Sequence, residues 1–169
     1  AVQHLLDCGH TEVAFISGPP SIKDSWERQH GYRRALQNAD ISYDEMLVVE
    51  GDFTEEGGYQ ATRRLLERQQ GFTALFVAND QMAAGAFQAL REAQLDIPQD
   101  ISVIGYDDVL FARYLYPALT TVRQPFGAMG QAAATLALAA IDGEETEETE
   151  VKRRFDPELI VRDSVKRIA

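Results

Sequence analysis

The stretch that decides the fold is residues 72–108, which read FTALFVANDQMAAGAFQALREAQLDIPQDISVIGYDD. Its short apolar run, Ala74–Ala78, predicts a strand buried on both faces. Asp80 then stands where a side chain can cap a helix, and apolar residues recur after it at helical spacing. Ile97-Pro98 ends this predicted helix, because the residue before a proline avoids the α region. A second apolar run, Ile101–Tyr106, predicts another strand, and two strands joined by one helix run parallel through a right-handed crossover.

The same alternation of strands and helices extends toward the N-terminus. Apolar runs predict two earlier strands, and amphipathic segments predict three earlier helices, the last of them capped by Thr54. The strands are expected at Val13–Ser17 and Leu47–Glu50, and the helices at about residues 2–8, 24–38 and 55–70. A helix followed by the order βαβαβαβ is typical of a doubly wound parallel sheet in an α/β domain.

Beyond Asp108 this alternation stops. The pattern predicts a short extended piece at Thr120–Val122, an alanine-rich helix at Gly127–Ile141 and an acidic loop at Gly143–Glu150. A final strand within residues 151–161, bent at Pro157, is expected at an edge of the sheet.

The composition excludes several classes of protein. A length of 169 residues and an apolar fraction of 45% suit one globular domain, and no apolar run is long enough to cross a bilayer. A net charge of -11 and a pI near 4.6 argue against direct binding to nucleic-acid phosphates. The single cysteine, Cys8, fits a reducing compartment, and the three histidines show no metal-ligand spacing. We therefore expect no metal, no cofactor and no membrane contact. Because the chain opens without methionine, in what already reads as a helix, we expect it to be part of a larger protein.

Parallel strands bring the loops that follow them to one edge of the sheet, where open α/β sheets bind ligands. Here those loops carry carboxylates, an amide, a guanidinium and an aromatic ring, at residues 19–28, 52–53, 79–80 and 107–108. Carboxylates accept hydrogen bonds from hydroxyls, arginine and asparagine donate them, and a ring covers the C–H face of a pyranose. Because no glycine-rich phosphate loop follows any strand, the set favours a neutral sugar or polyol over a nucleotide. Taken singly, each residue also has a structural interpretation as a surface arginine, a turn residue, a helix cap or a ring packed on the sheet rim.

Five segments together resemble one protein family. They are GHTEVAFISGPP, the Arg28-x-x-Gly31-Tyr32 spacing, FVANDQMAAGAFQAL, IPQDISVIGYDD and PALTTVRQPF. These segments are similar to the effector-binding region of lac/galactose-repressor-type transcription regulators, and the likeness covers nearly the whole chain. The family core resembles periplasmic sugar-binding proteins, in which two α/β lobes are hinged around a small ligand. The resemblance implies that residues 1–124 form the C-terminal effector-binding lobe, residues 125–150 a helix and acidic loop of an otherwise absent N-terminal lobe, and residues 151–169 a returning strand and tail.

The resemblance also implies roles for individual residues. Polar contacts to the effector are expected from Arg28, Asn79 and Asp107, a stacking ring from Phe53, and further contacts from Gln124 and Asp24. The family forms its homodimer through the positions of Ala84, Phe87 and Leu115, although core packing is an equal alternative for Phe87. Gln124 stands where the galactose-repressor branch has a tyrosine, which weighs against galactose itself as the effector.

These observations predict the effector-sensing portion of a cytoplasmic transcription regulator, which reaches operator DNA only through a headpiece outside this chain. The alternative is a periplasmic sugar-binding receptor of an uptake system. An enzyme that uses Asp107 and Asp108 as an acid/base pair is disfavoured, because neighbours on a strand point in different directions. The apolar face of Gly127–Ile141 suits a partner lobe, so we expect this helix to fold back, to pair with another chain or to project outward.

Overall fold

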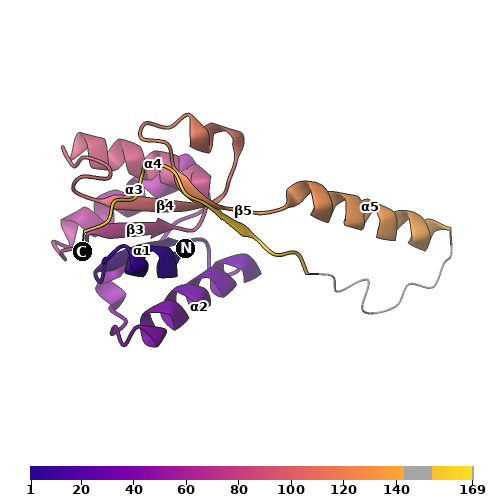
Figure 1. Ribbon diagram of the computed structural model, residues 1–169, viewed down its shortest axis with the longest axis horizontal. Helices are drawn as coiled ribbons and strands as arrows, with labels where there is room; N and C mark the ends of the chain where they lie inside the picture. Colours follow the sequence, from indigo (N-terminus) through magenta and orange to yellow (C-terminus); the bar gives the residue numbers. More distant parts are fainter. Residues whose placement is uncertain (143–153, 169) are drawn as a thin grey trace.

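The computed structural model describes residues 1–142 and 154–168, which form a six-stranded sheet between two layers of helices (Figure 1). The strand order is β2-β1-β3-β4-β5-β6; the first five strands are parallel, and β6 is antiparallel to β5. The bounds are β1 Val13–Ser17, β2 Val48–Glu50, β3 Ala74–Val77, β4 Ser102–Asp107, β5 Thr120–Arg123 and β6 Glu158–Ile160. The predicted doubly wound, mostly parallel α/β sheet is confirmed, and the final strand does lie at an edge.

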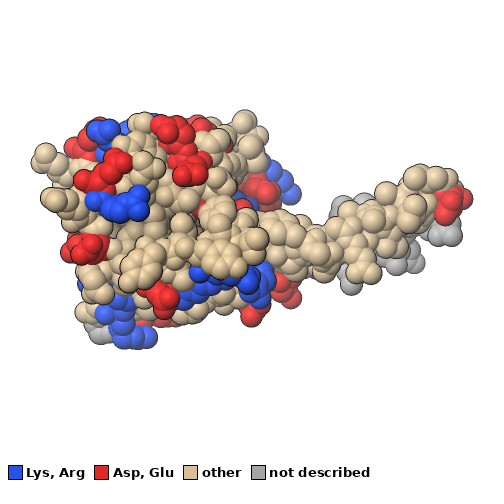
Figure 2. Space-filling model, turned by 90° about the horizontal axis from the view of Figure 1, so that it is seen from above, with Lys and Arg blue, Asp and Glu red and all other residues tan. Residues whose placement is uncertain are grey.

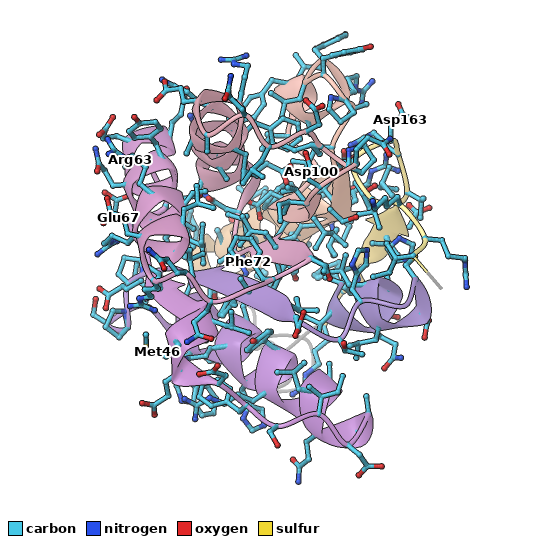
Figure 3. All side chains as sticks on the ribbon, turned by 90° about the vertical axis from the view of Figure 1, so that its left-hand side faces the viewer. Met46, Arg63, Glu67, Phe72, Asp100 and Asp163 are labelled. Atoms are coloured by element: carbon cyan, nitrogen blue, oxygen red, sulfur yellow. The ribbon has the colours of Figure 1, made fainter. Side chains whose placement is uncertain are left out.

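Helices cover both faces of the sheet. Helices α1 (Val2–Asp7) and α2 (Lys23–Asn38) lie on one face, and α3 (Glu55–Glu67) and α4 (Asp80–Glu92) lie on the other (Figure 1). Two 3-10 turns, Glu45–Leu47 and Leu110–Arg113, precede β2 and follow β4. The strand order reverses between β1 and β3, and at such a point the loops after the strands leave a crevice for ligands. Figure 3 views the opposite edge of the sheet, where the strands begin. Phe72 and Asp100 lie there, on the segments that lead into β3 and β4.

The core fixes α2 against the sheet. Every residue of β1 and β3 is buried, as the apolar runs predict. Phe15 of β1 stacks on Tyr32 of α2 and on Phe76 of β3, with ring centroids 5.0 and 4.9 Å apart. The Tyr32 hydroxyl also donates a 2.8 Å hydrogen bond to the backbone oxygen of Val13. The helix that carries Arg28 is therefore held by packing and by a buried hydrogen bond.

Helices α3 and α4 approach each other through glycines. A Cβ atom at Gly58 would lie 2.1 Å from the backbone oxygen of Met82, and one at Gly85 would lie 1.9 Å from that of Glu55. Any side chain at these positions would force the two helices apart. Because the loops at Phe53 and Asn79 immediately precede α3 and α4, this contact also holds those two loops together.

Some predicted boundaries were wrong. Asn79, not Asp80, caps α4, since its side chain accepts a hydrogen bond from the Met82 amide. Helix α4 ends well before Ile97-Pro98, because Gln94 turns the chain with a φ of 59°. Helix α3 likewise ends at Glu67 instead of near residue 70, and Leu47 belongs to a 3-10 turn instead of β2. The Thr54 cap is confirmed, with its side chain accepting from the Gly57 amide.

The final strand is shorter than predicted. It spans only Glu158–Ile160, and residues 154–157 are not in a strand. Residues 151–153 and the predicted acidic loop at 143–150 lie outside the described residues.

Helix α5 (Phe126–Ile141) extends away from the lobe after β5 (Figure 1). It has no charged residue, and Figure 2 shows it as a projection that is uncharged along most of its length. None of its residues is buried, and Leu138 and Ile141 are 62% and 79% exposed. Within this single chain the helix therefore projects and does not fold back. Among the described helices, none is both long and apolar enough to traverse a lipid bilayer.

Candidate functional site

Arg28 lies at the centre of the polar groups on the carboxyl edge of the sheet. Its side chain is only 12% exposed, so it is not a solvated surface arginine. Nη1 donates a 2.7 Å hydrogen bond to the backbone oxygen of Ala78, which follows β3. Nη2 lies 3.7 Å from the Asp107 carboxylate and 3.8 Å from that of Asp24, one helical turn earlier. The guanidinium thus joins α2 to the ends of β3 and β4, across the point between β1 and β3 where the strand order reverses.

Asp107 is held between Arg28 and Gln124. The Gln124 amide donates a 2.7 Å hydrogen bond to the same Asp107 oxygen that faces Arg28. Asp107 adopts a φ of 117°, at the point where β4 ends. Burial raises the pKa of the Asp107 carboxyl, although the Gln124 hydrogen bond and the Arg28 charge act in the opposite direction. Three segments that are distant in sequence therefore meet at one acceptor oxygen.

Asn79 and Phe53 form a second pair at this edge. The Asn79 side chain caps α4 and also donates a 3.1 Å hydrogen bond to the backbone oxygen of Phe53. Phe53 has a φ of 68°, so this bond supports a left-handed turn. Its ring lies over Gly18, where a Cβ atom would be 2.1 Å from the ring. The Arg28 guanidinium carbon lies 5.7 Å from the centre of this ring. Asn79 therefore positions Phe53, in addition to any contact that it offers a ligand.

Asp108 points away from Asp107. Its side chain is 3% exposed and accepts hydrogen bonds from Arg162 and, at 2.7 Å, from Arg123. Burial tends to raise the pKa of Asp108, but the hydrogen bonds from the two arginines outweigh it and lower this pKa. The two neighbouring carboxylates thus have different partners, which is unlike an acid/base pair.

Sequence reasoning missed Tyr106 at this edge, and it gave Asp80 only the role of a helix cap. The Tyr106 ring lies 4.2 Å from the Arg28 guanidinium, and burial raises the pKa of its hydroxyl. The position of Tyr106 next to Asp107, at the end of a predicted strand, was the signal that could have identified it. Asp80 is fully buried and accepts hydrogen bonds from the Thr121 hydroxyl at 2.6 Å and from the Val109 amide at 2.9 Å. No local pattern indicated this inward orientation.

A cavity of about 550 Å³ opens beside Arg28, which we call the Arg28 cavity. Asp24, Tyr106 and Gln124 also line it, together with residues of α1 and Pro157. Asp107 adjoins it through the Gln124 hydrogen bond, whereas Phe53 and Asn79 do not line it. Among the residues that the structure describes, no three histidine, cysteine or acidic side chains are grouped to bind a metal ion.

The predicted dimer residues lie elsewhere. Phe87 is 8% exposed and belongs to the hydrophobic core. Ala84 and Leu115 are half-buried, and Leu115 packs against the core. Within the same loop as Leu115, Tyr114 and Tyr116 are largely exposed.

The family model described as periplasmic binding protein-like domain matches residues 2–165. The chain belongs to this family.

Relatives of the periplasmic binding protein-like chain include transcription regulators. It is 43% identical over 165 residues to the HTH-type transcriptional regulator GalR of Escherichia coli strain K12, covering 98% of this chain and 48% of GalR. The CelR–cellobiose complex superposes with a TM-score of 0.92 at 40% identity, covering 97% of this chain and 50% of that one. A lac repressor dimer bound to operator and the anti-inducer ONPF superposes with a TM-score of 0.88 at 32% identity, covering 98% and 56%. The resemblance to lac/galactose-repressor-type regulators is confirmed, and this chain spans about half the length of the curated relatives that it matches.

Proposed function

We propose that this chain is the effector-sensing portion of a transcription regulator, and that its effector is a sugar or a similar small polyhydroxylated metabolite. The observation that carries the proposal is the convergence of Arg28 and Gln124 on one carboxylate oxygen of Asp107. We assign effector contacts to these three residues and to Phe53, Asn79 and Asp24.

The chemistry of these groups suits vicinal hydroxyls. Arginine has five N–H donors in a fixed plane, and the Ala78 oxygen occupies only one side of the Arg28 fork. The Asp107 carboxylate retains lone pairs that accept from hydroxyl groups. The Phe53 and Tyr106 rings, both close to Arg28, offer apolar faces to C–H groups.

The remaining part of the proposal concerns the whole protein. Residues 1–124 form the effector-binding lobe, residues 125–150 belong to a second lobe, and residues 151–169 return to the first. An effector that binds one arrangement of the lobes more tightly shifts the population toward it, and this shift changes operator binding by a separate headpiece. The regulator is a cytoplasmic homodimer, with contacts through the segments that carry Ala84, Phe87 and Leu115.

A periplasmic uptake receptor is the second candidate. The relatives described above are named as transcription regulators, which favours sensing over uptake. They also give no support to an enzyme, and the separate partners of Asp107 and Asp108 agree with this.

The test is effector binding by the intact protein. A thermal-shift screen of monosaccharides and disaccharides identifies the effector, and calorimetry then measures its affinity. Because Arg28 is buried and donates charge-assisted hydrogen bonds, Arg28→Ala is expected to cost about 2 kcal/mol, or roughly 30-fold in affinity. Arg91→Ala, at an exposed position of α4, is the control and should bind normally. Normal affinity in Arg28→Ala would remove Arg28 from the site, and unchanged operator affinity on effector binding would contradict the regulatory role.

A further inference from the structure

A second cavity, of about 240 Å³, lies against α2 and has no lining residue in common with the Arg28 cavity. We call it the Trp26 cavity. Its polar lining groups are the side chains of Ser17, Ser25, Trp26, Gln29 and Glu50. Ser25 and Trp26 lie in the segment 19–28 that the sequence placed at the ligand edge, but the proposed effector site uses none of these five residues.

The fold brings these side chains together from three elements. Ser17 and Glu50 are register partners at the carboxyl ends of β1 and the edge strand β2. Ser25 and Gln29 lie one helical turn apart on α2, on the face next to the one that carries Asp24 and Arg28. Trp26 is 60% exposed, and its ring stacks on His30 with centroids 5.4 Å apart and an angle of 10° between the planes. His30 thus covers one face of the indole and restrains its orientation.

Several polar side chains of this cavity have no hydrogen-bond partner among the described residues, and one of them is buried. The Ser25 hydroxyl is buried, with the residue 2% exposed, and it has no hydrogen-bond partner. A buried polar group that is left unpaired is destabilising, so the Ser25 hydroxyl needs a partner from outside the chain. Within residues 1–142 and 154–168, the side chains of Ser17, Gln29 and Glu50 also form no hydrogen bond or ion pair. In the proposed effector site, by contrast, the Asp107 carboxylate already accepts a hydrogen bond from Gln124 and forms an ion pair with Arg28.

The unused groups define the class of ligand. Hydroxyls and an amide donate and accept, the indole N–H donates, and the Glu50 carboxylate only accepts. A neutral polyhydroxylated ring satisfies this mixture, and the exposed part of the Trp26 ring can cover its C–H face. The Glu50 charge disfavours an anion, and one carboxylate is too few for a metal ion. The volume of about 240 Å³ lies below the range of about 300–1,000 Å³ that is usual for ligand pockets, which favours a single sugar ring.

We propose that the Trp26 cavity is a second carbohydrate site, which binds a monosaccharide independently of the effector site. The two sites are neighbours at Gly18. A Cβ atom there would lie 2.1 Å from the Phe53 ring and 2.5 Å from the Ser25 hydroxyl oxygen. Since their lining residues differ, each site can be disabled without changing the other.

Trp26 is the only tryptophan in this chain. Its fluorescence therefore reports on the Trp26 cavity, provided that tryptophans elsewhere in the intact protein are removed. The intact protein, with any tryptophan outside this chain replaced by phenylalanine, is titrated with D-glucose, D-galactose and D-ribose as probes. At least one probe should give a saturable change in Trp26 emission. Ser25→Ala and Glu50→Gln should each weaken that response about tenfold, because each removes one hydrogen bond to the sugar. Ser21→Ala, an exposed serine outside the cavity, is the matched control and should respond like the unmodified protein.

Arg28→Ala separates this proposal from the proposed function. It should weaken effector binding roughly 30-fold and leave the Trp26 response intact. Ser25→Ala removes an unpaired hydroxyl, so its melting temperature should be unchanged or higher, which shows that a lost response is not unfolding. The proposal is overturned if no probe gives a saturable change, if Arg28→Ala removes the change, or if both Ser25→Ala and Glu50→Gln leave it unaltered. The last two outcomes would mean that the sugar binds outside the Trp26 cavity.

Discussion

The Asp80 carboxylate accepts a 2.6 Å hydrogen bond from the Thr121 hydroxyl, although 41 residues separate the two. This bond joins the first residue of α4 to β5, the strand that leads to Gln124 and α5. A Cβ atom at Gly105 would lie 2.3 Å from the Asp80 oxygen, so the intervening strand β4 has room for the carboxylate only because residue 105 is glycine. Asp80 therefore ties the carboxyl edge of the sheet to β5, the strand that leads to α5.

The burial of Asp80 predicts a pH dependence of stability. Burial raises the pKa of Asp80 to about 6, despite the hydrogen bonds from Thr121 and Val109, and the Asp107 and Asp108 charges add to the rise. Since the pKa in the folded state exceeds the unfolded value of 3.8, the folded state binds the proton more tightly. This contribution is fully present below the unfolded pKa and is lost as pH rises to about 6, by about 3 kcal/mol.

Asp80→Asn should remove this contribution. Denaturant unfolding from about pH 4 to about pH 7 measures the difference in slope between the mutant and the unmodified protein. Glu12→Gln, at an exposed position just before β1, is the control, because it leaves the surroundings of Asp80 unchanged. Equal slopes in the Asp80→Asn and unmodified proteins would show that Asp80 titrates normally.

Asp108 should contribute to stability through its two arginines. Asp108→Asn leaves Arg162, whose side chain is 14% exposed, without its ionic partner and should destabilise the lobe by about 3 kcal/mol. Glu158→Gln removes the other carboxylate beside Arg123, but Glu158 is 67% exposed and its loss should cost less than about 1 kcal/mol. Urea unfolding of both variants checks this ranking. Similar losses of stability in the two variants would mean that the burial of Asp108 does not strengthen its ion pairs.

Two helical glycines, one in the close contact between α3 and α4 and one in an open part of α2, should respond in opposite ways to substitution by alanine. Gly58→Ala would place its methyl group 2.1 Å from the Met82 backbone oxygen, which should cost about 2 kcal/mol or more. Gly31→Ala, in α2, meets no atom within 4 Å and should stabilise the protein by about 0.5–1 kcal/mol through helix propensity. Thermal unfolding distinguishes the two. A neutral Gly58→Ala would show that the helices separate easily.

Gln124 should keep Asp107 ionised for effector binding. Its hydrogen bond opposes the rise that burial causes in the Asp107 pKa, so Gln124→Ala should raise that pKa further. Effector affinity should then fall with decreasing pH, and the fall should begin at higher pH than in the unmodified protein. Calorimetry between about pH 4 and about pH 8 measures this pH dependence, because the Asp107 pKa is raised from its ordinary value of 3.8. Asp107→Asn should bind weakly without this pH dependence, and an identical pH profile in Gln124→Ala would contradict the assigned role.

The neighbouring pair Asn79 and Asp80 marks the limit of prediction from sequence. Both side chains are good helix caps, and the sequence interpretation chose Asp80. The structure uses Asn79 as the cap because Asp80 is drawn inward by Thr121 and Val109, which lie far along the chain. The predicted meeting of Arg28 with the ends of β3 and β4 succeeded for the opposite reason. It follows from parallel strands, whose carboxyl ends must share an edge.

The sequence by itself determined the order of the elements, the parallel sheet and the edge at which polar loops gather. These follow from hydrophobic periodicity, strand length and turn chemistry, which act between residues close in the chain. Only the tertiary structure decided that Asp107 faces Arg28 while Asp108 faces Arg162, and that one face of α2 leaves Ser25 unpaired beside Trp26. Those outcomes depend on burial and on distances between remote segments, where a difference of a few ångströms determines whether a charge is paired or a hydroxyl is left without a partner.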